Sequence, residues 1–463
     1  MISKKNIIKR AGMVIVAACT MAGSLCYSPN QIKAEEYWPE GPAIASPSAI
    51  VMEVNTGTIL YEKNSHVQNY PASITKILTT YLTLENCDLN EKVVFSEDAV
   101  YKNEGDTSHI WRDIGEEMTI EQCLYGVMLA SANECAYAVA EHISGSIEAF
   151  ADLMNAKAKE LGCVNTNFVN PHGLHDDNHY TCCYDMALIA KAAYENETFR
   201  IITSTKARMI PPTNKHAEET PLQNHNKLLH RYQKGNYVYE YCTGGKTGYT
   251  TNANATLVTF AEKDGMALVC VVMNTDGVSE WTDSRALFDY CFDNFQLLNV
   301  SENETGYEVQ KEINANSLSG NPPFVELDKN ACILLPKTVE FTEAESEVTL
   351  NREVSNIAGT ISYSYAGRSV GKADIVTTGA VIEEYVFDNQ IENAAEEEET
   401  IQLKPSTIVA IAAMICLLIV MLLLGKYVYD NIYIIRHNLS VQMDRRERFR
   451  EIKKRKQRRR RRR

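Results

Sequence analysis

Three short motifs in this chain combine residue types that can perform serine chemistry. Ser73 and Lys76 lie three residues apart in a segment with helical spacing, so we expect both side chains on one helix face. A serine hydroxyl becomes a nucleophile when a base lies within hydrogen-bonding reach, and a neutral lysine can be that base. Ser131 and Asn133 form a second pair, two residues apart, whose side chains can point into one cleft. The third motif is Lys246-Thr247-Gly248, at an expected strand.

The order and spacing of the motifs carry more information than each motif alone. Ser-x-x-Lys, Ser-x-Asn and Lys-Thr-Gly each arise by chance, but here they follow one another at gaps of 58 and 115 residues. This set is typical of penicillin-binding proteins and class A β-lactamases, in which the serine is the nucleophile. The chain resembles the low-molecular-mass penicillin-binding proteins, the serine D-alanyl-D-alanine carboxypeptidases, over about residues 40–390. Four further segments share the resemblance: Asn170–Leu174, His179–Thr181, Tyr184–Ala187 and Asn224–Leu229.

The resemblance implies a role for each motif residue. Ser73 is expected to attack the carbonyl group between the last two D-alanines, Lys76 to take its proton, and Ser131 to pass a proton to the leaving amine. The backbone N–H groups of Ser73 and Tyr249 would form the oxyanion hole. The implied substrate-binding residues are Asn133, Lys246, Thr247, Gly248 and Tyr249, of which Lys246 and Thr247 would hold the terminal carboxylate.

The expected activity is removal of the terminal D-alanine from the stem pentapeptide of peptidoglycan, with β-lactams as inhibitors and without a cofactor. Two alternatives stay open: a D,D-endopeptidase with the same residues, and a slow-turnover sensor that binds peptidoglycan or β-lactams. Burial and a charged Lys246 would both lower the pKa of Lys76 and make it a base. This reasoning takes Lys246 as charged.

Two departures from the family pattern affect the site. Family members often carry an arginine for the substrate carboxylate shortly before the last helix of the domain, whereas this chain has Ser279-Glu280-Trp281-Thr282 there, and Arg285 is a possible substitute. No glutamate occurs from Leu161 to Tyr194, where class A β-lactamases place their deacylating glutamate, so efficient penicillin hydrolysis is not expected.

A group of histidines and aspartates between residues 172 and 179 has the composition of a metal site. His172, His175 and His179 with Asp176 and Asp177 are interpreted instead as a polar loop near the cleft, because the serine and lysine chemistry needs no metal.

The elements that must position these residues follow from hydrophobic periodicity. Ala49–Asn64 predicts a hairpin around Asn55-Thr56-Gly57, and the runs 255–261 and 266–273 predict a second hairpin around Asp264-Gly265. Between them, helical spacing marks 73–84, 120–143, 146–159 and 184–194, and a last helix is expected over 283–292. Strands from both ends of a domain around a helical block indicate an α+β fold, here a penicillin-binding and β-lactamase-like peptidase domain over residues 40–298.

A small all-β domain is expected over residues 301–387. Its β-favouring runs are separated by Gly, Pro and Asn: Ala331–Leu335, Glu347–Leu350, Gly359–Tyr365 and Val381–Val386. An acidic stalk is expected to follow over residues 388–405, because this segment is rich in Glu and Asn and poor in large apolar groups.

Both ends of the chain suggest export and membrane attachment. Residues 1–34 combine an early basic stretch with an apolar run, which predicts a signal peptide, and lipidation at Cys19 is the alternative. Thr407–Leu424 is 18 uncharged, mostly apolar residues, which predicts a transmembrane helix over 406–425. The positive-inside rule then places the basic tail 426–463 in the cytoplasm and the catalytic domain outside a single-pass cell membrane protein.

The charge distribution separates the two sides of that membrane. The whole chain carries −14, the tail +12 and the first 34 residues +5, which leaves −31 on the part between. An acidic domain repels phosphates, so no nucleic-acid partner is expected, and the tail is interpreted as attracted to anionic lipids. The cysteines of the exported part are interpreted mostly as buried thiols.

Overall fold

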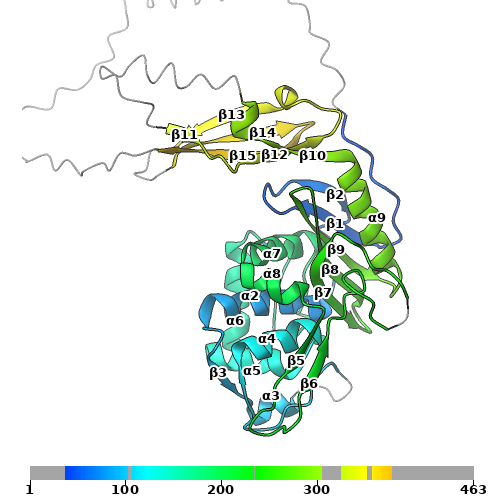
Figure 1. Cartoon of the computed structure of the whole chain (residues 1–463), viewed down its shortest axis with the longest axis vertical. Coiled ribbons are helices and arrows are strands. Elements are labelled where there is room, and N and C mark those ends of the chain that lie inside the picture. Colours follow the sequence, from blue (N-terminus) through cyan, green and yellow to red (C-terminus); the bar gives the residue numbers. More distant parts are fainter. Residues whose placement is uncertain (1–36, 103–106, 234, 305–324, 352–356, 378–463) are drawn as a thin grey trace, which may run out of the picture. The chain divides into compact units, whose positions relative to one another are not determined.

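The computed structural model describes residues 37–102, 107–233, 235–304, 325–351 and 357–377 (Figure 1), and they all belong to one compact unit. The expected signal peptide, acidic stalk, transmembrane helix and basic tail lie outside the described residues. Within the described ranges, no helix is long and apolar enough to cross a membrane.

An antiparallel sheet of five strands, in the order β2-β1-β9-β8-β7, organises the catalytic region. Its strands are β1 (Ser48–Glu53), β2 (Ile59–Lys63), β7 (Cys242–Thr250), β8 (Asn254–Lys263) and β9 (Met266–Thr275). They come from both ends of the region, and both predicted hairpins are confirmed. Asp264 and Gly265 adopt φ angles of 52° and 79°, which is the backbone that a two-residue hairpin turn requires.

The sheet is covered on both faces, as alternate residues of β9 reveal. Val269 and Val271 pack in a cluster with the helical block, whereas Leu268 and Cys270 pack in a second cluster with α9 (Ser279–Asn294). Figure 1 shows α9 and the other helices on opposite sides of the strands. Because both faces are buried, β8 and β9 read as nearly continuous apolar runs rather than as alternating strands.

The helical block follows the predicted pattern in part: two short helices and two short ladders were not predicted, and one predicted helix is divided into two. Its helices are α2 (Lys76–Asn86), α3 (Glu97–Tyr101), α4 (Ile120–Leu129), α5 (Asn133–Ser144), α6 (Ile147–Glu160), α7 (Cys183–Glu195) and α8 (Glu197–Ser204). Two short ladders join it: β3 (Lys92–Val94) with β4 (Glu117–Thr119), and β5 (Ala207–Ile210) with β6 (Thr220–Gln223). The prediction of a single helix over 120–143 is wrong, because the helix is interrupted at residues 130–132, between α4 and α5.

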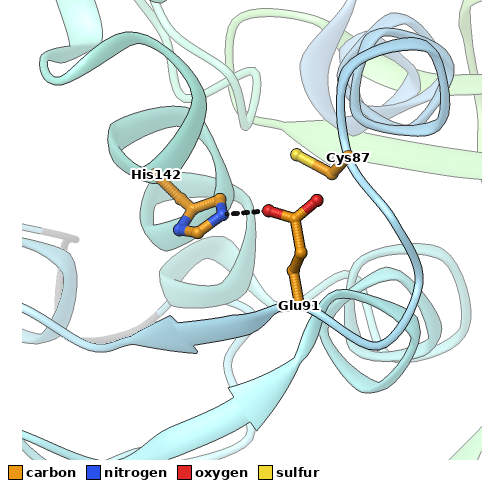
Figure 2. Close-up of side chains that lie close together, drawn as sticks. All are labelled: Cys87, Glu91 and His142. Carbon is orange, nitrogen blue, oxygen red and sulfur yellow. Dashed lines mark hydrogen bonds and ion pairs between the residues drawn. The ribbon is translucent and has the colours of Figure 1, made fainter.

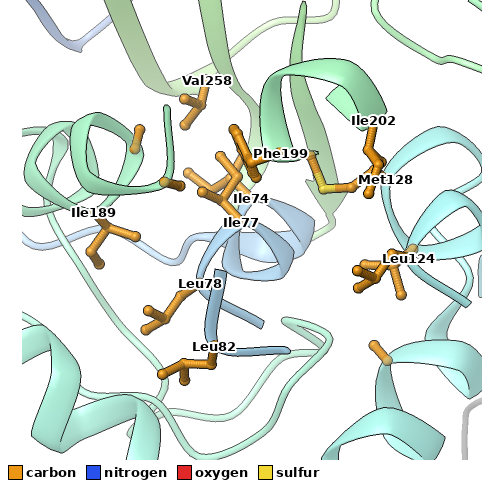
Figure 3. Packing of buried hydrophobic residues seen from close by; sticks show 14 of the residues in the cluster. Ile74, Ile77, Leu78, Leu82, Leu124, Met128, Ile189, Phe199, Ile202 and Val258 are labelled. Carbon is orange, nitrogen blue, oxygen red and sulfur yellow. The ribbon is translucent and has the colours of Figure 1, made fainter. Parts of the chain in front are cut away.

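Helix α2 lies in the middle of the larger hydrophobic cluster (Figure 3). Ile74, just before the helix, and Ile77, Leu78 and Leu82 within it are all fully buried. Around them lie side chains from α4, α7, α8 and β8, namely Leu124, Met128, Ile189, Phe199, Ile202 and Val258. Packed elements therefore hold the segment that carries Ser73 and Lys76 in place.

A second sheet, in the order β10-β12-β15-β14-β13 with β11 paired to β15, follows the catalytic region. Its elements are β10 (Phe295–Asn299), α10 (Val300–Asn303), β11 (Val325–Leu327), β12 (Cys332–Pro336), η2 (Phe341–Glu343), β13 (Glu345–Leu350), β14 (Ile357–Tyr365) and β15 (Arg368–Thr377). The runs at β12, β13 and β14 were predicted, the run at 381–386 lies outside the described residues, and β10, β11 and β15 were missed. Gly371 in β15 allows close pairing, since a Cβ there would lie 2.7 Å from the Cys332 carbonyl oxygen.

Candidate active site

Ser73 and Lys76 meet at the start of α2. Ser73 lies in a short 3-10 turn, η1 (Ala72–Thr75), that runs directly into the helix. The Lys76 Nζ atom lies 3.1 Å from the Ser73 Oγ atom, the distance that a proton transfer between them needs. The sequence-predicted nucleophile and base are thus within hydrogen-bonding reach.

Lys76 is completely buried, and its other two partners are both hydrogen-bond acceptors. Its amine donates to Oδ1 of Asn133 at 2.7 Å and to the carbonyl oxygen of His172 at 2.6 Å. A neutral amine has two N–H groups and one lone pair. If the two N–H groups serve Asn133 and His172, the lone pair is left for the Ser73 hydroxyl proton.

The electrostatic surroundings favour that neutral form. Burial, and then the nearby Lys246, hold the pKa of Lys76 well below its usual range, as the sequence predicted. Glu134 acts in the opposite direction, but burial raises the pKa of its own carboxyl group and so weakens its negative charge. The dominant effects therefore favour an uncharged Lys76.

The second motif occupies the break between α4 and α5. Ser131 adopts a φ of 62°, which interrupts the helix, and Asn133 begins α5. Asn133 is held in place because its Nδ2 atom donates to Oγ1 of Thr107 at 2.9 Å while its Oδ1 atom accepts from Lys76. Because of this break, Ser131 and Asn133 both face the cleft, although the sequence pattern predicts a continuous helix there.

The third motif lies on β7, beside Ser73. A Cβ on Gly248 would lie 2.8 Å from the Ser73 backbone nitrogen and would also clash with the Thr256 hydroxyl. Lys246 is buried, and its amine donates to the Thr247 carbonyl oxygen at 2.7 Å. Burial lowers the pKa of Lys246 to about 7, which differs from the expectation that this amine stays charged. At neutral pH, both the charged and the neutral form of the Lys246 amine are therefore populated.

A cleft of about 480 Å³ opens over these residues. Six of the predicted site residues line it: Ser73, Ser131, Asn133, Thr247, Gly248 and Tyr249. Lys76 and Lys246 lie behind this lining and are fully or almost fully buried.

The cleft also contains residues that the sequence reasoning did not assign. Lys227, Glu280 and Trp281 line one part of its wall, and the Lys227 amine lies 5.7 Å from the centre of the Trp281 ring. Burial raises the pKa of Glu280 to about 8. Arg285 is not part of the lining, since its side chain is 55% exposed, pairs with Asp289 at 3.8 Å and lies over Tyr239. Lys227 lies within Asn224–Leu229, one of the segments that resemble the family. That resemblance was the sequence signal that could have identified Lys227 as a site residue.

The polar loop 170–179 supports the site from behind. Val169 N–H donates to Nδ1 of His179, so the proton of the neutral ring lies on Nε2, 2.9 Å from the Thr75 hydroxyl. That hydroxyl donates in turn to the Ala72 carbonyl oxygen in the Ser73 turn. Burial lowers the pKa of His179 to about 3, so the ring stays neutral. These contacts give His179 a structural role in shaping the turn.

Comparison with known proteins points to one family. Residues 35–277 match the family described as D-alanyl-D-alanine carboxypeptidase. The chain is 33% identical over 317 residues to D-alanyl-D-alanine carboxypeptidase DacF of Bacillus subtilis, covering 66% of this chain and 77% of that protein. It is 27% identical to DacA of Haemophilus influenzae, covering 75% and 88%. Among solved structures, it is similar to penicillin binding protein 5 from Haemophilus influenzae, with a TM-score of 0.58 and 26% identity over 73% of this chain and 98% of that one.

Replacing Gly248 by alanine tests whether β7 must touch the Ser73 turn. The new Cβ would displace the Ser73 N–H, an expected oxyanion donor, so acylation by a fluorescent penicillin should slow by about a hundredfold or more. The matched control is Gly277→Ala, on the same cleft wall, where a Cβ meets no atom within 4 Å. Equal acylation rates in the two variants would contradict the close contact.

Proposed function

Because the chain belongs to the D-alanyl-D-alanine carboxypeptidase family, we propose that it removes the terminal D-alanine from peptidoglycan stem pentapeptides through an acyl-enzyme on Ser73. The observation that carries this proposal is the buried Lys76 amine, which lies 3.1 Å from the Ser73 hydroxyl and whose other partners among the described residues are two acceptors. Such an amine is a preformed base for serine chemistry.

The proposed reaction has two halves. Ser73 Oγ bonds to the carbonyl carbon of the penultimate D-alanine while its proton passes to Lys76 Nζ. The backbone N–H groups of Ser73 and Tyr249 stabilise the oxyanion, and the C–N bond breaks as the leaving amine receives a proton through Ser131. Water then attacks the ester, again with Lys76 as the base, and the release of the shortened peptide restores Ser73.

The carboxylate of the substrate is proposed to bind at Thr247 and Lys227. Thr247 lines the cleft with Lys246 directly behind it, and Lys227 supplies a cation on the wall where Glu280 lies instead of the expected arginine. A bound carboxylate would favour the charged form of Lys246, whose pKa is about 7. A charged Lys246 in turn favours a neutral Lys76, so substrate binding itself would prepare the base.

Release of free D-alanine from a synthetic pentapeptide is the direct test. The wild-type protein should release it and Ser73→Ala should not. Lys227→Met should raise KM by about ten- to a hundredfold, the usual loss when a charge-assisted hydrogen bond is removed. Lys263→Met is the matched control, since the Lys263 amine lies over Tyr241 rather than in the cleft.

The alternatives give different outcomes in the same experiment. A D,D-endopeptidase would cleave cross-linked dimers and leave the pentapeptide intact. A slow-turnover sensor would be labelled by penicillin at Ser73 without releasing D-alanine. Release of D-alanine by Ser73→Ala would contradict the proposed nucleophile.

We further propose that the chain is a single-pass membrane protein whose catalytic domain lies outside the cytoplasm. The family acts on the cell wall, which fixes the side on which the catalytic domain must work. Support for the anchor is the uncharged segment 407–424 followed by a tail of net charge +12, which would also attract anionic lipids.

Protease accessibility in intact cells tests this topology. Protease added outside should release the catalytic domain by cutting within residues 388–405, while an epitope placed after Arg463 should stay protected. Truncation after Gln402 should release an exported protein that penicillin still acylates. Digestion of the epitope, or membrane binding of the truncated protein, would show that the anchor or its orientation is wrong.

A further inference from the structure

Away from the catalytic cleft, the side chains of Cys87, Glu91 and His142 point toward one another (Figure 2). Their sulfur, carboxylate oxygen and ring nitrogen atoms all lie within 4.8 Å of one another. Cys87 caps the C-terminal end of α2, Glu91 directly precedes β3, and His142 lies in the last turn of α5. The proposed peptidase reaction uses none of the three.

The spacing of these atoms is close to that of a tetrahedral metal site. Nε2 of His142 lies 3.0 Å from Oε2 of Glu91. Nitrogen and oxygen ligands at the usual zinc distances are separated by about 3.3 Å, and sulfur and oxygen ligands by about 3.6 Å. A zinc ion could therefore replace this hydrogen bond after shifts of a few tenths of an ångström, with a thiol movement of at most about 1.2 Å.

The local charges favour a cation at this position. The Asp88 N–H donates to Oε1 of Glu91 at 2.6 Å, while Oε2 of the same carboxylate faces His142. A metal ion that binds Cys87 would displace the thiol proton. The C-terminal ends of α2 and α5 add the negative ends of two helix dipoles.

We propose that Cys87, Glu91 and His142 bind one zinc ion, with water as the fourth ligand. Thiolate, imidazole and carboxylate are the three side-chain ligands that zinc accepts in proteins, and three of them with one open position form a stable tetrahedral set. Binding transfers the Cys87 proton to solvent and involves no change of oxidation state.

The ion would join the two helices that carry the catalytic lysine and its partner. Lys76 begins α2 and Asn133 begins α5, and the two side chains are bonded at 2.7 Å. The zinc would connect the opposite ends of the same helices, through Cys87 and His142. It would therefore restrain the relative position of the helices, and bound zinc should raise the temperature of unfolding.

A second cluster in the described part of the chain provides an internal comparison. Asp113, Glu116 and His216 also bring three ligand atoms together. The buried Glu116, however, already pairs with Arg112 at 2.8 Å and accepts from the Thr213 hydroxyl at 2.7 Å. Because the guanidinium neutralises this carboxylate, we expect the second cluster not to bind zinc.

Cobalt titration of the full-length protein in detergent tests the proposal. After reduction and removal of metals, cobalt should produce the absorption of a tetrahedral thiolate complex, and zinc should abolish it at one equivalent per chain. Cys87→Ser should lose the thiolate band. His142→Asn should bind cobalt at least about tenfold more weakly, because even the loss of a residue that only contacts a metal ligand weakens metal binding by this factor. Zinc should raise the unfolding temperature of the wild type but not of Cys87→Ser.

Two variants serve as matched controls. Cys332→Ser removes another half-buried free thiol, and His216→Asn removes the histidine of the second cluster, so both should bind cobalt as the wild type does. Cooperative unfolding of each variant, followed by circular dichroism, verifies folding without reference to peptidase activity. The proposal is wrong if the wild type gives no thiolate band, or if Cys87→Ser retains it.

Discussion

The catalytic site depends on one constraint: a lysine amine is buried completely, and no carboxylate within the described residues is bonded to it. Transfer of a charged amine into such a place costs several kcal/mol, so Lys76 is driven toward its neutral form. In the neutral form, the two N–H groups can serve the Asn133 and His172 oxygen atoms, which leaves the lone pair for the Ser73 hydroxyl proton. A serine carboxypeptidase needs a base of this kind, and Lys76 is the base that we propose.

The fold meets this constraint by bringing three distant segments to one point. The first turns of helix α2 lie among packed elements, which buries Lys76 one turn after Ser73, the proposed nucleophile. The break before α5 presents Asn133 to it, and β7 approaches so closely that only glycine fits at residue 248. The loop that carries His172 and His179 closes the site from behind, through one bond to Lys76 and another to the Ser73 turn.

The sequence was sufficient to predict the motif residues, the two hairpins and most helices, because each depends on local patterns. It could not predict the break at Ser131, since apolar residues continue through it with helical spacing, or β15, whose Gly371, Lys372 and Asp374 are uncommon in strands. The lowered pKa of Lys246 and the place of Lys227 beside Trp281 depend on tertiary burial. Cys87 and His142 lie 55 residues apart in sequence, so only the packing of α2 against α5 reveals their proximity.

The rate of acylation by a fluorescent penicillin, measured against pH, tests the neutral base most directly. If Lys76 must lose its proton first, the rate should rise with pH through a value well below the ~10.4 of a free lysine. Lys76→Arg should abolish acylation, because a guanidinium does not deprotonate in this range. A rate that does not change with pH, or a Lys76→Arg protein that is still acylated, would contradict this account.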